Sequence, residues 1–133
     1  MTQLRVYAPA ETSNHLAALR QLADLGVATD HNEPFGDQTW VDLRAGRAWL
    51  ITTGHPMLTG AAAIIIPERT EHPVLVELLV APDQRGNGLG HQIVHATKQL
   101  LARHSHNHQT ITAWSHGDHP AARQLAPKLD LEP

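Results

Sequence analysis

The chain has 133 residues, of which 41% are hydrophobic and 17% charged, with a formal net charge of −3 and no cysteine. That length fits one domain, and the lack of cysteine excludes disulfides, thiolate metal ligands and cysteine nucleophiles. The scattered basic residues give no footprint for nucleic acid, and no apolar run suffices for a membrane span or a signal peptide, so we expect a cytoplasmic protein.

The N-terminal third is predicted to form one strand and two helices. Residues 4–7 alternate in polarity like a short strand, and residues 10–26 carry leucines at the spacing of one helical face, with Gly26 as the expected stop. Residues 31–38 have the chemistry of a turn. A second short helix is expected over residues 39–46.

The rest of the chain is predicted to form a strand meander followed by a strand, helix, strand unit. Residues 48–53, 61–66 and 74–80 are apolar runs bounded by glycines and prolines, which indicates three strands in series. A helix over residues 89–103 would face inward with Ile93, Val94, Thr97, Leu100 and Leu101. Residues 110–114 then predict a strand parallel to the third, and residues 119–131 a last helix with Pro120 at its start.

A glycine-rich hexamer separates the third strand of the meander from the long helix. It reads Arg85, Gly86, Asn87, Gly88, Leu89 and Gly90. Glycines leave backbone N–H groups uncovered, and a helix that begins there adds the positive end of its dipole. The hexamer is therefore expected to bind an anion, most naturally a phosphate.

Two common phosphate motifs do not fit this hexamer. A P-loop needs Lys and Ser or Thr after its glycines, but Gly90 is followed by His91 and Gln92. A dinucleotide-binding fold needs an acidic residue about 20 positions further on, yet no Asp or Glu lies between Asp83 and Asp118.

A third pattern, R/Q-x-x-G-x-G/A, is met by Arg85, Gly88 and Gly90 directly after a strand and before a helix. It resembles the acyl-CoA pyrophosphate loop of the GNAT N-acetyltransferases. The plain alternative is a tight turn with surface glycines. The likeness runs over residues 4–131, and it implies the GNAT fold: an α/β (α+β) domain whose mixed central sheet has an antiparallel meander, a parallel β-α-β cofactor unit and helices on both faces.

Within that family, residues 77–90 and 113–131 are similar to the N-terminal half of the actinobacterial mycothiol synthases, which consist of two tandem GNAT halves. The chain would then be a single domain over residues 1–133 that stops where the family's final strand begins. The resemblance implies acetyl transfer from acetyl-CoA to the cysteinyl amine of a glucosaminyl-inositol. It implies no metal.

The resemblance also implies which residues bind the cofactor. Backbone groups of Leu78, Leu79 and Val80 would contact the pantetheine and the thioester carbonyl, while the leucine side chains pack in the core. The pyrophosphate would lie on the hexamer from Arg85 to Gly90.

Two carboxylates are candidates for the chemistry of the acceptor. Glu77 is the nearest possible base by sequence, and by alternation it points opposite to Leu78; it is otherwise a surface or paired glutamate. Asp37 occupies the position of an acidic residue that contacts the amino-sugar substrate in the resembled subfamily. The alternative interpretation is that Asp37 caps the helix that follows.

The usual general acid of the family is missing from the last predicted helix. A Leu-Tyr-x-x-x-Gly-Phe pattern would place its tyrosine at position 126, where this chain has Ala126. Ser115 and His116 are alternative acids, although His116 also suits a capping turn ahead of Pro120.

Histidines and tryptophans are assigned structural roles. His104, His106 and His108 alternate like metal ligands on an extended strand, but they follow a helix in a polar stretch, which favours a solvated loop. The three tryptophans lie on apolar faces and are expected to pack in the core, namely Trp40, Trp49 and Trp114.

Three functions follow from these features. The first is an acetyltransferase with a small-molecule amine as acceptor and neither nucleic acid nor membrane as partner. The second is an inert half that binds acetyl-CoA and supports a second GNAT domain or a homodimer. The third is an acetyltransferase for another small amine or a protein N-terminus.

Overall fold

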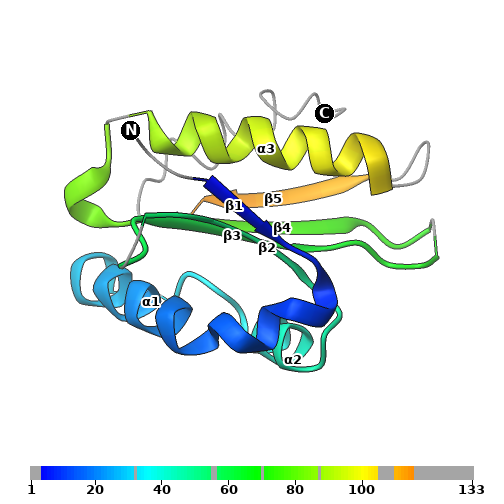
Figure 1. The fold of residues 1–133 in the computed structure, drawn as a ribbon, viewed down its shortest axis with the longest axis horizontal. Helices are drawn as coiled ribbons and strands as arrows, with labels where there is room; N and C mark the ends of the chain where they lie inside the picture. The colour runs from blue at the N-terminus through cyan, green and yellow to red at the C-terminus, as the bar shows by residue number, and fades with distance from the viewer. Residues whose placement is uncertain are drawn as a thin grey trace.

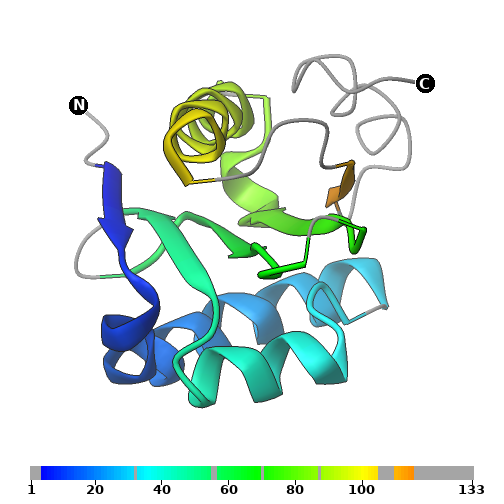
Figure 2. The same cartoon turned by 90° about the vertical axis from the view of Figure 1, so that its right-hand side faces the viewer.

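A computed structural model describes residues 4–31, 33–54, 57–69, 71–86, 88–104 and 110–115. In chain order the elements are β1 (Leu4–Tyr7), the 3₁₀ helix η1 (Pro9–His15), α1 (Leu16–Asp30), α2 (Asp37–Arg44), β2 (Trp49–Thr53), β3 (Gly60–Ile65), β4 (Val74–Val80), the 3₁₀ turn η2 (Pro82–Gln84), α3 (Leu89–His104) and β5 (Ile111–Ser115). The strands form one sheet (Figure 1). Figure 2 shows α3 on one face of that sheet and α1 with α2 on the other.

The strands lie across the sheet in chain order, from β1 at one edge to β5 at the other. β1 to β4 pair antiparallel, whereas β5 pairs parallel to β4 because the chain crosses over through α3. These pairings confirm the predicted meander and the predicted strand, helix, strand unit. The chain leaves β4 at Val80 and enters α3 at Leu89, so the glycine-rich residues lie at the carboxyl end of β4.

Alternation along the strands divides the hydrophobic core between the two faces of the sheet. The core under α3 includes Leu78 of β4 and the buried face of the helix. The core against α1 and α2 includes Leu79, the next residue of β4. The inward residues predicted for the long helix are all buried, namely Ile93, Val94, Thr97, Leu100 and Leu101.

Two of the tryptophans pack as expected. Trp49 is half-buried against the core under α3, and Trp40 is half-buried against the opposite core, with its ring edge-on to Phe35 at a centroid distance of 5.7 Å. The side chain of Trp114 lies outside the described residues.

The first long helix does not stop at Gly26, so that prediction is wrong. α1 continues to Asp30 and ends at His31, which adopts the left-handed conformation with φ of 61° and donates its N–H to the Val27 carbonyl at 2.9 Å. Gly26 is buried inside the helix instead. A Cβ at this position would lie 3.2 Å from Cδ1 of Leu79, so the glycine permits a close approach between α1 and β4.

The segment before α1 also differs from the prediction of a continuous helix from residue 10. Residues 9–15 form the 3₁₀ helix η1. The Thr12 hydroxyl donates to the carbonyls of Pro9 and Leu43, both at 3.0 Å, and such side-chain bonds compete with α-helical geometry. α2 begins at Asp37, two residues before the predicted start. The predicted last helix lies outside the described residues.

Candidate active site

The glycine-rich loop leaves open space at the end of β4. Gly86 and Gly88 have φ of 86° and 83°, in the left-handed region that side chains with a Cβ rarely adopt. A Cβ built on either glycine would meet no atom of the described structure within 4 Å. Packing inside the protein therefore does not require these glycines, and the space beside their backbone is open to a ligand. Asn87 lies outside the described residues.

The N-terminus of α3 faces the same loop. The first amides of an α-helix have no partner four residues earlier, and the helix dipole is positive at that end. Here the N–H of Gln92 donates to the Gly88 carbonyl at 3.2 Å. Gly90 has no side chain, and the Leu89 side chain is buried, so the first two residues of the helix leave their backbone uncovered on the loop side. These groups suit a diphosphate.

The end of β4 uses its side chains for packing. Leu78 is 3% exposed and Leu79 is fully buried, on opposite faces of the sheet, which confirms that both side chains belong to the core. On one side, Leu79 and Val80 pair with β3. On the other side, the described pairing with β5 ends at Leu78 and Ser115. The residues that follow β5 lie outside the described residues.

Arg85 directs its side chain to the protein itself. Its Nη1 and Nη2 donate to the two carboxylate oxygens of Asp30 at 2.9 and 2.7 Å, and its Nε donates to the Val80 carbonyl at 3.1 Å. Asp30 is the last residue of α1. The guanidinium therefore joins the loop to the end of α1 and to the end of β4.

Glu77 is a buried glutamate with hydrogen-bond partners. The sequence had left two interpretations open for it, a catalytic base and a surface or paired glutamate. It is 7% exposed and points to the face opposite Leu78, as alternation predicted. Its two carboxylate oxygens lie 3.3 and 3.2 Å from the Gly36 nitrogen, whose N–H it accepts, and it also accepts the Thr39 hydroxyl. Gly36 is the N-cap of α2, so this carboxylate lies at the positive end of that helix.

Asp37 is the first residue of α2, and the cap is Gly36 rather than Asp37. Its side chain is exposed. Because Gly36 and Thr39 both bind Glu77, the structure brings the segment that carries Asp37 against β4. The two candidate carboxylates, chosen for separate reasons, thus belong to one region on the α1 and α2 face of the sheet.

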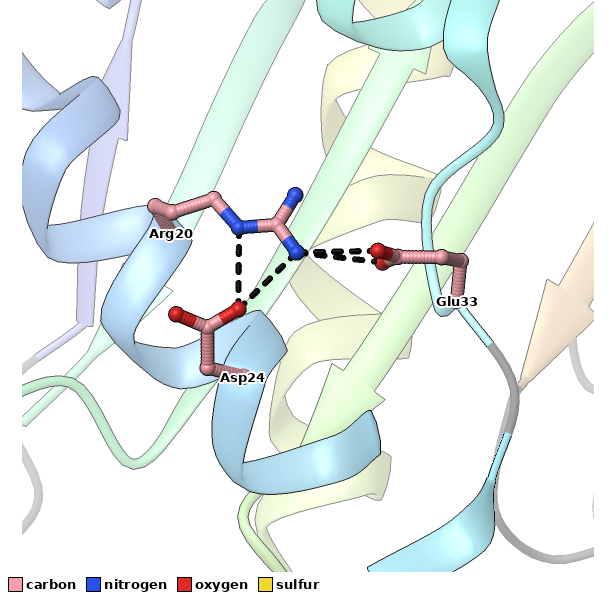
Figure 3. Close-up of polar contacts among 3 residues, drawn as sticks. All are labelled: Arg20, Asp24 and Glu33. Atoms are coloured by element: carbon pink, nitrogen blue, oxygen red, sulfur yellow. Dashed lines mark hydrogen bonds and ion pairs between the residues drawn. The ribbon is translucent and has the colours of Figure 1, made fainter. Parts of the chain in front are cut away.

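A charged cluster holds the segment between α1 and α2. Arg20 projects from α1, and its guanidinium contacts Asp24 and Glu33, each at 2.9 Å (Figure 3). Its Cζ also lies 5.1 Å from the ring centroid of Trp40. The hydrogen bond to Glu33, and to a smaller extent that to Asp24, raises the pKa of Arg20 above its ordinary value, so the guanidinium stays charged. The buried Nε1 of Trp40 has no hydrogen-bond partner within the described residues.

The histidine run starts differently from the prediction of a loop. His104 is the last residue of α3, and its ring lies 4.4 Å from that of Trp49 between centroids. His106 and His108 lie outside the described residues. Among the residues that the structure describes, no three His, Cys, Asp or Glu side chains gather in a group able to hold a metal ion. Within the same ranges no helix has the length and apolar character of a membrane span.

The candidates for the general acid lie at or beyond the end of the described chain. Ser115 is the last residue of β5, while His116 and Ala126 are outside the described residues.

Sequence reasoning missed two residues that organise this region. Asp30 fixes Arg85, and Thr39 donates to Glu77. Neither belongs to a recognisable motif, and their partners are 55 and 38 positions away in the chain. The only signal in the sequence for a basic partner of Asp30 was an acidic residue at the C-terminal end of a helix, where the dipole disfavours negative charge.

Residues 15–130 match the family model described as the acetyltransferase (GNAT) family. The mycothiol acetyltransferase of Kocuria rhizophila is 37% identical over 79% of this chain and 34% of its own length. That of Renibacterium salmoninarum is 30% identical over 97% of this chain and 39% of its own length. The chain therefore spans less than half the length of these curated relatives.

Solved structures show the same fold. Escherichia coli ElaA matches 85% of this chain and 77% of its own with a TM-score of 0.68, at 22% identity. At that identity the likeness concerns the fold alone, and it confirms the expected mixed sheet with helices on both faces.

Proposed function

This chain belongs to the acetyltransferase (GNAT) family, and from that premise we propose that it binds acetyl-CoA and transfers the acetyl group to the cysteinyl amine of a glucosaminyl-inositol. One observation carries the proposal most: Gly86 and Gly88 adopt left-handed conformations beside open space, where α3 begins. The names of the relatives from Kocuria rhizophila and Renibacterium salmoninarum support the choice of acceptor.

The backbone of residues 86–90 would hold the diphosphate of the cosubstrate. Uncovered N–H groups can donate to phosphate oxygens without displacing any side chain, because neither Gly86 nor Gly88 has a neighbour where a Cβ would be. Bound acetyl-CoA supplies an acetyl group activated as a thioester. Backbone N–H groups between Leu78 and Val80 would donate to the thioester oxygen and stabilise the negative charge that develops there.

Attack of the amine on the thioester carbonyl forms the C–N bond of the amide, breaks the C–S bond and releases CoA as a thiolate, which takes up a proton. The acceptor amine must itself lose a proton before or during attack. We propose Glu77 as the group that receives it, directly or through a water molecule. The carboxylate lies on β4 next to Leu78, and the Gly36 N–H and the Thr39 hydroxyl hold it in place. Asp37, exposed at the start of α2 near the same site, would contact polar groups of the acceptor.

A second candidate function is binding of acetyl-CoA without turnover. It is favoured by Ala126, which stands where the family pattern has a tyrosine. Such a domain would support another catalytic unit.

The binding step is tested by titrating acetyl-CoA and CoA in a calorimeter against the parent and Gly88→Asp. The variant places a carboxylate where the diphosphate would lie, so we expect its affinity to fall at least about a hundredfold, which combines like-charge repulsion with lost access. Gln99→Asp adds the same charge to an exposed position of α3 away from the loop and is expected to bind like the parent. Equal affinities for Gly88→Asp and the parent would exclude this loop as the site.

The chemical step is tested by thiol release with a panel of amines, including the cysteinyl glucosaminyl-inositol, other amino sugars and peptide N-termini. The proposed acceptor should be turned over fastest. Binding of CoA with no release on any amine would support the second candidate, and preference for another amine would replace the proposed acceptor.

A further inference from the structure

We propose that Arg85 is a positioning residue for the cofactor loop, joined to Asp30, and does not bind the diphosphate with its side chain. This inference rests on the proposed function of the loop as a cofactor site. It differs from the simplest expectation, in which an arginine within a phosphate loop pairs directly with phosphate.

The pair between Arg85 and Asp30 has the geometry of a strong contact. Two guanidinium nitrogens donate to two carboxylate oxygens at 2.9 and 2.7 Å, which is a bidentate arrangement. The side chains are 24% and 11% exposed. A third donor, Nε, is directed to the Val80 carbonyl at 3.1 Å. Both edges of the guanidinium are therefore engaged with the protein.

Transfer of the guanidinium to a ligand would be unfavourable. It would leave the Asp30 carboxylate, 11% exposed, without this partner and close to a newly arrived diphosphate. A buried charge that loses its ion-pair partner is costly, and repulsion between the carboxylate and the phosphates would add to that cost. The pair should therefore persist when the ligand binds.

The contact explains how a loop with so little packing keeps its shape. Gly86 and Gly88 have no neighbours at their Cβ positions, so they contribute no side-chain contacts. Arg85 connects this part of the chain to the ends of β4 and α1. Asp30 directly precedes the segment that leads to Gly36 and Asp37. The same pair therefore also fixes one end of the segment that carries Asp37, the residue proposed to contact the acceptor.

Asp30→Asn distinguishes the two roles of Arg85 because they predict opposite changes in the Kd for CoA. If Arg85 binds phosphate, removing Asp30's charge frees the guanidinium and removes a repulsive anion, so CoA should bind more tightly. If Arg85 positions the loop, the weakened pair lets the loop rearrange, and we expect the Kd for CoA to rise about tenfold. Calorimetric titration of the parent and the variant measures this directly.

Asp24→Asn is the matched control, since it removes the same charge from the same helix. Asp24 pairs with Arg20 on the exposed surface, so the Kd for CoA should stay within about twofold. Arg85→Lys keeps the positive charge and loses the bidentate geometry. It should bind CoA as weakly as Arg85→Gln if positioning matters, and nearly as well as the parent if charge alone matters.

Hydrogen exchange of the free protein gives a readout without ligand. The hydrogen-bonded amides at the two ends of the loop, those of Gln84 and Gln92, should exchange faster in Asp30→Asn than in the parent or Asp24→Asn. Unchanged exchange, or CoA affinity equal to or above that of the parent in Asp30→Asn, would overturn the inference. If the parent itself fails to bind CoA, the proposed function fails, and the exchange comparison alone decides whether Arg85 anchors the loop.

Discussion

The carboxylate of Glu77 does two things at once in this structure. It satisfies the N–H of Gly36 and the hydroxyl of Thr39 at the start of α2, and it lies on the strand that leads to the proposed acetyl site. Burial of an ionised carboxylate is tolerated here because donors and a helix N-terminus surround it. A structural role and a role as base therefore have to be separated by experiment.

Glu77→Gln keeps the shape of the side chain and removes its ability to take a proton. The amide oxygen can still accept the Gly36 N–H, so affinity for acetyl-CoA should not change. We expect kcat for the amine identified by the panel to fall about a hundredfold or more, the usual contribution of a general base.

Thr39→Val is the control for that variant, because it removes a donor from the same buried group and leaves the carboxylate. We expect its free energy of unfolding to fall by about 1–2 kcal/mol and its kcat to change less than about tenfold. Equal losses of kcat and of stability in the two variants would show that Glu77 serves only to position α2.

At the scale of elements, α1 and β4 approach each other closely at Gly26. Leu79 is fully buried, and two of its methyl carbons would lie 3.2 and 3.3 Å from a Cβ at this position. Helix propensity by itself favours alanine over glycine by about 1 kcal/mol, while overpacking of a core costs about 1–3 kcal/mol. The cost of overpacking is therefore expected to outweigh the gain in helix propensity.

Gly26→Ala should therefore lower the free energy of unfolding by about 1 kcal/mol, measured by urea denaturation. Ala28→Gly, at an exposed position of the same helix, should cost a similar amount through propensity alone. A rise in stability for Gly26→Ala would mean that Leu79 moves aside easily and that α1 does not depend on this glycine.

At the scale of the whole molecule, the glycine-rich loop proposed to bind the cofactor lies where three parts of the fold meet. β4 ends there, α3 begins there, and the Arg85 contact adds the end of α1. A ligand bound at such a junction should stabilise the folded state as a unit, since it has no comparable site in the unfolded chain.

CoA at a concentration one hundred times its Kd should stabilise the parent by about 2.7 kcal/mol, which for a chain of this size raises Tm on the order of 10 °C. Thermal denaturation followed by circular dichroism measures the shift. Gly88→Asp binds at least about a hundredfold more weakly, so the same concentration should stabilise it by at most about 0.4 kcal/mol, whereas Gln99→Asp should shift like the parent. A shift in Gly88→Asp as large as in the parent would place the ligand elsewhere.

The sequence by itself determined the order and type of most described elements, the inward face of α3 and the side of the sheet to which Glu77 points. Those features depend on periodicity and turn chemistry within short segments, which a local pattern records. The extent of α1 was misjudged because Gly26 looks like a stop in the sequence and acts as a packing site in the structure.

Tertiary structure alone decided which groups the candidate residues contact. Arg85 meets Asp30 across 55 positions of the chain, and Glu77 meets Gly36 across 41. No local pattern encodes such pairs, because they arise from how α1 and α2 pack on the sheet. The sequence thus predicted an anion-binding loop from its glycines, while the fold determined that the arginine beside them contacts Asp30 and the Val80 carbonyl.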